Sequence, residues 1–140
     1  MSNSTYGLKW HKFLVFCIGL GAVLDLVLGG ITLLSAFAAE TQNLMLVLLI
    51  STVFCIVSAV FSFVVHGRLK GLCANGPKLL VAMYILQLVV TIADSIIPVV
   101  LAPELYTFDS SSIVGSITGT IIAIAINSSY YKKREDIFVN

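Results

Sequence analysis

Charged side chains are scarce in this sequence, and their scarcity narrows the class of protein. Lysine, arginine, aspartate and glutamate make up 11% of the 140 residues, whereas hydrophobic residues make up 59% and the mean hydropathy is +1.04. Soluble domains carry roughly 25% charged residues. The basic residues do not gather into the stripe that nucleic-acid binding requires. The composition therefore predicts a membrane protein and argues against a nucleic-acid partner.

The sequence also lacks the motifs of redox and metal chemistry. Its three cysteines, Cys17, Cys55 and Cys73, form no C-x-x-C pair, and no H-E-x-x-H motif is present. Neither His11 nor His66 has a second histidine at ligand spacing, and a zinc site needs three or four ligands. We therefore expect no enzymatic activity, no cofactor and no metal, and we expect both histidines to serve in packing.

Four long apolar runs cover about residues 13–38, 44–65, 79–101 and 111–127. A helix needs about 20 apolar residues to cross a hydrocarbon core of about 30 Å. The runs are continuous rather than alternating, which is typical of membrane helices and not of membrane barrels. The first run, at about 26 residues, is longer than a signal-peptide core, so we expect it to be a retained helix. The sequence predicts an all-α integral membrane four-helix bundle that is surrounded by the lipid bilayer. It forms a single domain over residues 1–140, of which residues 128–140 are predicted to be a cytoplasmic tail.

The distribution of positive charge predicts the orientation of the bundle. All eight basic residues fall on one side of the predicted spans. They are Lys9, Lys12, Arg68, Lys70, Lys78, Lys132, Lys133 and Arg134. The opposite connections carry Glu40, Glu104 and Asp109 and no basic residue. By the positive-inside rule, both termini are expected in the cytoplasm of a cell whose plasma membrane holds the protein.

Two aspartates, Asp25 and Asp94, stand inside the apolar runs, far from the basic edge. An aspartate at the centre of a membrane helix costs about 2.5–3.5 kcal/mol on insertion scales, and such acids usually face the interior of a bundle. No basic residue is predicted at their depth. The partner of each acid is then a proton, a bound cation, hydroxyl or amide donors on neighbouring helices, or the other aspartate sharing one proton.

Polar residues share the helical face of Asp94. Gln87, Thr91 and Pro98 fall on that face, and Pro98 has no N–H to donate to the carbonyl of Asp94. Helices interrupted in this way are a feature of ion and substrate sites in transporters, although a simple helix kink is the other interpretation. We therefore predict that Asp25, Asp94, Gln87 and Thr91 bind a proton or cation.

Glycines stand where helices can approach each other closely. Gly21 and Gly29 lie on the same narrow strip of the first helix as Asp25, and Gly115 and Gly119 form a G-x-x-x-G in the fourth. These four glycines predict close helix packing, either within one chain or between chains. A monomer of four helices can bury few such faces, which favours a homo-oligomer or a membrane-protein partner.

A weak internal repeat relates the two halves of the chain. Lys9 and Lys78 are separated by the same number of residues as Asp25 and Asp94. The two helical hairpins would then be parallel repeats about an axis along the membrane normal, with both aspartates at equal depth. The alternative is a chance alignment of two hairpins.

The C-terminal stretch NSSYYKKREDIFVN sets aromatic residues beside basic ones. Tyr130 and Tyr131 at headgroup level, with Lys132, Lys133 and Arg134 just beyond, are predicted to anchor the fourth helix at the membrane surface. This ending and the N-terminal GLKWHKFLVF resemble those of small uncharacterised four-helix membrane proteins of Firmicutes. The resemblance covers the two ends more than the middle, and it implies a bacterial membrane protein without an established activity.

These features together predict a small, oligomeric, multi-pass membrane protein that binds or conducts a proton or small cation at its intramembrane acids. The alternative is an accessory or scaffold protein whose acids and small-residue faces pack against a partner, with no transport of its own. A polar, water-accessible cavity that reaches either aspartate would favour the first hypothesis.

Overall fold

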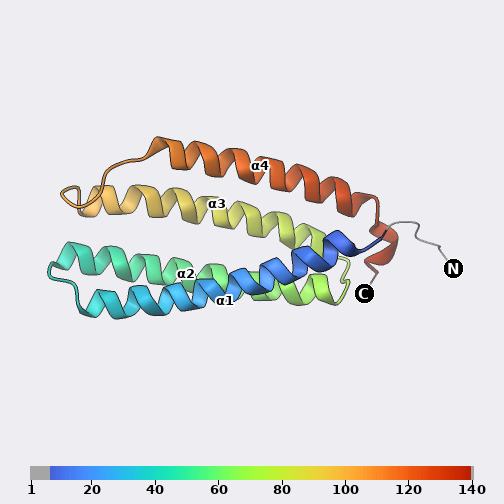
Figure 1. Ribbon diagram of the computed structural model, residues 1–140, viewed down its shortest axis with the longest axis horizontal. Helices are drawn as coiled ribbons and strands as arrows, with labels where there is room; N and C mark the ends of the chain where they lie inside the picture. Colours follow the sequence, from blue (N-terminus) through green and yellow to red (C-terminus); the bar gives the residue numbers. More distant parts are fainter. Residues whose placement is uncertain (1–6, 140) are drawn as a thin grey trace.

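Four long helices joined by short connections make up most of the described chain (Figure 1). The computed structural model describes residues 7–139. In chain order the elements are α1 (Lys9–Phe37), α2 (Gln42–Lys70), α3 (Gly76–Leu101), α4 (Ser110–Lys132) and a short 3-10 helix, η1 (Glu135–Ile137). All four α-helices are long and apolar enough to span a membrane. The predicted all-α class and the four membrane-length helices are thereby confirmed.

The helices extend further than the apolar runs predicted, mainly at the ends that carry lysine and arginine. α1 begins at Lys9 rather than near residue 13, α2 continues to Lys70, and α4 continues to Lys132. The predicted boundaries stopped where the hydropathy fell, but lysine and arginine are good helix formers whose long apolar stems can line a helix end. Much of the predicted tail, residues 128–140, is therefore the end of α4 and η1.

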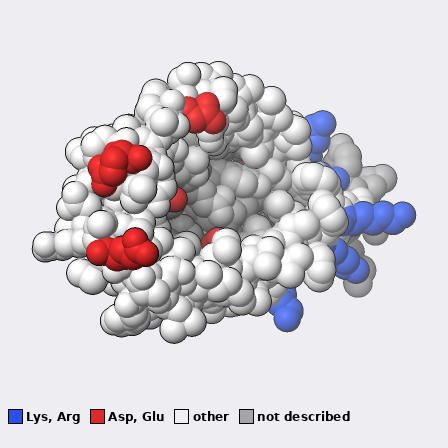
Figure 2. All heavy atoms as spheres, turned by 60° about the vertical axis from the view of Figure 1, so that its left-hand side comes forward, with Lys and Arg blue, Asp and Glu red and all other residues white. Residues whose placement is uncertain are grey.

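Charge divides the bundle into two ends. The basic end holds the first turn of α1, the turns on either side of the α2–α3 connection, and the end of α4 with the residues after it. The acidic end holds the α1–α2 connection at 38–41 and the α3–α4 connection at 102–109, which carry Glu40, Glu104 and Asp109. Figure 2 shows acidic residues around a hollow at the acidic end, and the basic residues away from it.

The hydrophobic core lies toward the basic end. α1 packs on α2, α2 on α3, and α3 on α4. At the basic end α1 also meets α4: His11 Nδ1 lies 3.0 Å from the hydroxyl of Tyr131, and Trp10 Nε1–H donates to Asn127 Oδ1 at 3.0 Å. The buried cluster at this end comprises Leu14, Ile18, Val65, Leu69, Leu80, Met83, Tyr131 and Phe138. Buried side chains and contacts between α1 and α4 therefore join the helices at the basic end, whereas the acidic end is hollow.

Two of the five residues predicted to anchor α4 at the membrane surface are buried instead. Tyr131 is 3% exposed and Arg134 is 9% exposed. The Tyr131 ring packs edge-on against His11, which belongs to the first turns of α1. Lys132 and Lys133 are exposed. All five residues lie at the basic end of the bundle, where packing between the two chain ends turns Tyr131 and Arg134 inward.

Large apolar side chains face outward along the bundle. Phe16, Val60, Val89 and Ile121, one from each helix, are all more than half exposed. Water-soluble monomers rarely expose contiguous apolar patches larger than a few hundred Å². An outer surface of this kind suits contact with lipid, as expected of a multi-pass membrane protein.

Candidate functional site

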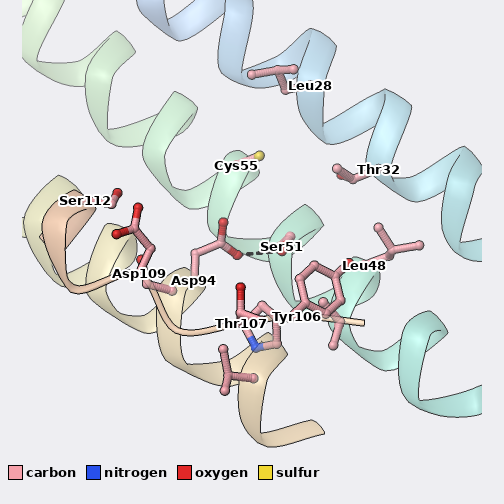
Figure 3. A pocket seen from close by; sticks show the side chains of 14 residues that line it. Leu28, Thr32, Leu48, Ser51, Cys55, Asp94, Tyr106, Thr107, Asp109 and Ser112 are labelled. Atoms are coloured by element: carbon pink, nitrogen blue, oxygen red, sulfur yellow. Dashed lines mark hydrogen bonds between the residues drawn. The ribbon is translucent and has the colours of Figure 1, made fainter. Parts of the chain in front are cut away.

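A cavity of about 510 Å³ lies between the helices near the acidic end. All four helices and the α3–α4 connection contribute to its wall (Figure 3). Its polar lining residues are Thr32, Ser51, Cys55, Asp94, Ser95, Tyr106, Thr107, Asp109 and Ser112. None of the described residues that line it is lysine, arginine or histidine. The cavity is therefore polar along part of its wall, and the charges on that wall are negative.

Asp94 directs its carboxylate toward α2 at the wall of this cavity (Figure 3). The hydroxyl of Ser51 donates a hydrogen bond to Asp94 Oδ1 at 2.6 Å. No described residue donates a hydrogen bond to the second oxygen, Oδ2. Asp94 thus presents a carboxylate that is oriented through one oxygen and available through the other.

Pro98 stands inside α3 one turn beyond Asp94, where the helix continues without a break; it is buried and lines the same cavity. Because proline has no N–H, the main-chain carbonyl of Asp94 lacks its usual helical donor one turn further on. The Asp94 side chain is itself exposed and lines the cavity. The cost of placing an ionised aspartate in hydrocarbon, about 2.5–3.5 kcal/mol, is reduced when the group faces a water-accessible space.

Asp109 adds a second carboxylate to the cavity wall from the α3–α4 connection. It caps the N-terminus of α4, where its Oδ1 accepts hydrogen bonds from the hydroxyl and the N–H of Ser111. These donors hold the pKa of the Asp109 carboxyl below its ordinary value, because they stabilise the ionised form. Asp109 is therefore negatively charged at neutral pH.

Asp25 does not belong to the cavity lining. It is half-buried on α1, and no described residue pairs with it or donates a hydrogen bond to it. Asp25 and Asp94 both lie close enough to Cys55 of α2 to interact with its thiol electrostatically, and Cys55 lines the cavity. The two aspartates therefore share a neighbour on α2 but occupy different environments.

Gln87 and Thr91 lie outside the Asp94 cavity. They line a separate groove between α3 and α4, together with Gly119, and the Thr91 hydroxyl donates to the main-chain carbonyl of Gln87 at 2.9 Å. Both share the helical face of Asp94, but Gln87 is two turns, about 10 Å, nearer to the basic end. Of the four residues predicted to bind a proton or cation, the structure places only Asp94 in the cavity.

The four glycines predicted to allow close packing have different surroundings. A Cβ atom added to Gly29 would lie 3.2 Å from the Cβ of Cys55, so α1 and α2 do approach closely there. A Cβ atom added to Gly21, Gly115 or Gly119 would have no described atom within 4 Å. Of these four glycines, only Gly29 packs closely against another helix of the same chain. The two glycines of the G-x-x-x-G in α4 face open space.

Both histidines take part in contacts between helices. The His66 ring of α2 lies against Gly19 of α1, where an added Cβ would come within 2.8 Å of the ring. His66 Nδ1 also lies 2.9 Å from the main-chain carbonyl of Val15. Gly19 was not among the four glycines predicted to allow close packing, although small residues are what let membrane helices approach closely.

Several cavity residues were not predicted from the sequence. Ser51 and Cys55 on α2, and Tyr106 and Asp109 in or beside the α3–α4 connection, contribute to the wall. A signal was available for α2, because Ser51, Cys55 and Ser58 recur at the spacing of one helical face. For Tyr106 and Asp109 the sequence offered no such signal, since only the fold of the connection brings them beside Asp94.

Two carboxylates without a cationic side chain beside them create a negative potential that attracts protons and cations. Within residues 7–139, no group of three or more histidine, cysteine, aspartate or glutamate side chains is placed to hold a metal ion. The three cysteines are free. No protein-family model, no curated protein and no solved structure matches this chain.

Proposed function

We propose that this protein is a small multi-pass protein of the plasma membrane that binds a proton or small cation at Asp94 and conducts it across the membrane. The observation that carries this proposal is the cavity that reaches Asp94, whose charged lining residues are the two acids Asp94 and Asp109. Intramembrane acids that face a water-accessible space commonly mark ion and proton pathways. Asp25, close to Cys55 but outside the cavity, is a second protonatable group in the same region.

The charge asymmetry supports an orientation for the cavity. With the basic end in the cytoplasm, as the positive-inside rule predicts, the cavity faces the outside of the cell. The opposite end is held together by the His11–Tyr131 and Trp10–Asn127 contacts. A site open to one side and closed to the other matches one state of a carrier that works by alternating access.

The unpartnered glycines of α4 support a homo-oligomer. Gly115 and Gly119 are exposed, and neither has a neighbour within reach of an added Cβ. Surfaces of this kind allow two membrane helices to approach closely, so a second copy of the chain can pack there.

Flux measurements with purified protein in liposomes test the proposal. A proton or sodium gradient is imposed, and ion movement is followed with a dye enclosed in the vesicles. We expect flux from the wild type, no flux above empty liposomes from Asp94→Asn, and wild-type flux from Glu40→Gln, which removes an exposed acid outside the cavity. Wild-type protein that gives no flux would favour the accessory or scaffold hypothesis instead.

A further inference from the structure

The cavity at Asp94 is much larger than a proton or a bare metal cation requires. Its volume of about 510 Å³ falls within the range of roughly 300–1,000 Å³ that is typical of pockets for small organic molecules. A water molecule occupies about 30 Å³ of the liquid. A single inorganic cation would therefore leave most of this space to water.

The wall of the cavity is also more apolar than an inorganic cation site needs. Leu28 of α1, Leu48 of α2 and Val99 of α3 contribute aliphatic surface from three directions. Tyr106 contributes an aromatic side chain from the α3–α4 connection, and aromatic rings attract cations over their faces. An apolar group that covers such a surface removes it from contact with water, and this lowers the free energy of the bound state.

The negative charge lies on the part of the wall formed by α3 and the α3–α4 connection. Asp94 is oriented by Ser51 through Oδ1, and its Oδ2 accepts no hydrogen bond from a described residue. Asp109 provides the second carboxylate. An ammonium group has N–H donors and a positive charge, and both suit carboxylate oxygens that no basic side chain neutralises.

We propose that this cavity binds a monovalent organic cation, in which an ammonium group pairs with Asp94 and Asp109 and an apolar substituent packs against Leu28, Leu48 and Val99. This inference rests on the function proposed above, because it names the class of cation that the same site takes. The ligand reaches the site from the acidic end, to which Asp109 and its connection belong (Figures 2 and 3).

Calorimetric titration of the purified, full-length protein in detergent micelles tests this inference. The probes are benzylammonium and benzyl alcohol, which have nearly the same size and differ in charge, and titrations into empty micelles correct for partitioning. We expect benzylammonium to bind at least about tenfold more tightly than benzyl alcohol, as a charge-assisted contact implies. Asp94→Asn should lower the affinity for benzylammonium by about tenfold or more on the same grounds.

A second variant tests the space rather than the charge. Val99→Trp keeps both carboxylates but fills part of the cavity, so it should also weaken benzylammonium binding. Glu40→Gln is the matched control, because it removes a carboxylate that does not line the cavity, and its affinity should equal that of the wild type. Circular dichroism and gel filtration establish that each variant is folded.

Equal affinity for the two probes, or benzylammonium binding that both Asp94→Asn and Val99→Trp leave unchanged, would overturn the organic-cation proposal. If proton or sodium flux in liposomes still depends on Asp94 in that case, the function proposed above stands with an inorganic ion as its cargo. Conversely, benzylammonium binding that depends on Asp94 in a protein without any flux retains the organic-cation site and rejects transport.

Discussion

Ser51 and Asp94 join α2 to α3 through a 2.6 Å hydrogen bond at the wall of the cavity. The hydroxyl donates to Oδ1, so the carboxylate is held in one orientation while Oδ2 stays available to a ligand. The bond therefore links the packing of two helices to the geometry of the proposed cation site.

Replacing Ser51 tests whether this orientation matters. Ser51→Ala removes the donor but leaves the Asp94 charge, so flux should fall by roughly threefold to tenfold rather than vanish. Ser51→Thr keeps a hydroxyl and should restore most of the wild-type rate. Liposome flux measured for the three proteins decides the matter, and an alanine variant with the wild-type rate would show that the bond has no part in transport.

The internal repeat and the structure make different predictions for Asp25. A true repeat makes Asp25 and Asp94 equivalent, whereas the structure places only Asp94 in the cavity. We therefore expect Asp25→Asn to change the affinity for benzylammonium by no more than about twofold, and Asp94→Asn to lower that affinity about tenfold. Calorimetric titration of both variants with the same cation distinguishes the two. Equal losses would support a shared site formed by both acids.

Two glycines provide a matched pair for helix packing. Gly29→Leu places a large side chain where an added Cβ already lies 3.2 Å from Cys55, so it should lower the free energy of unfolding by about 1–3 kcal/mol. Gly119→Leu meets open space within the chain and should instead weaken association between copies. Thermal unfolding and light scattering in detergent measure the two effects. Unchanged oligomer size and stability for Gly119→Leu would mean that this face contacts lipid.

Labelling of single cysteines tests the orientation of the bundle. The three native cysteines are first replaced by alanine, and then Thr41→Cys, Thr107→Cys or Lys70→Cys is introduced. A membrane-impermeant maleimide added to intact cells should modify positions 41 and 107, at the acidic end, and leave position 70 unmodified. Modification at position 70 from outside would invert the topology and place the cavity mouth in the cytoplasm.

The hydrogen bonds at the N-cap of α4 predict that the stability of the protein changes with pH in the acidic range. The pKa of Asp109 is lowered in the folded protein from its ordinary value of 3.8, because Ser111 donates hydrogen bonds to the ionised form. The stabilisation is thus complete above pH 3.8 and is lost as the pH falls through the lower, folded pKa. Asparagine also caps helices but does not titrate in this range.

Thermal unfolding of the wild type and of Asp109→Asn across acidic pH tests the cap. The difference in melting temperature between them should be constant at neutral pH and should shrink below pH 3.8, where the wild-type carboxylate takes up its proton. A difference that does not vary with pH would mean that the Ser111 bonds do not stabilise the charged form.

The sequence was sufficient for the class of protein, the number of long helices and the division into a basic and an acidic end. Each of these follows from local composition, because a run of about 20 apolar residues forms a helix in lipid whatever its neighbours are. Helix ends were predicted less well. α1 and α4 run on through lysines that hydropathy alone had assigned to the connections.

The composition of the site was decided by the tertiary structure. Gln87 and Thr91 share the helical face of Asp94, yet they line a different groove, while Asp109 lies in a connection and reaches the cavity. Periodicity gives the direction of a side chain around its own helix, but not the neighbour that it meets, which depends on how the helices pack and where they separate. Here the buried cluster holds the basic end together and the acidic end is hollow, so of the two intramembrane aspartates the one beside Ser51 became part of a cavity.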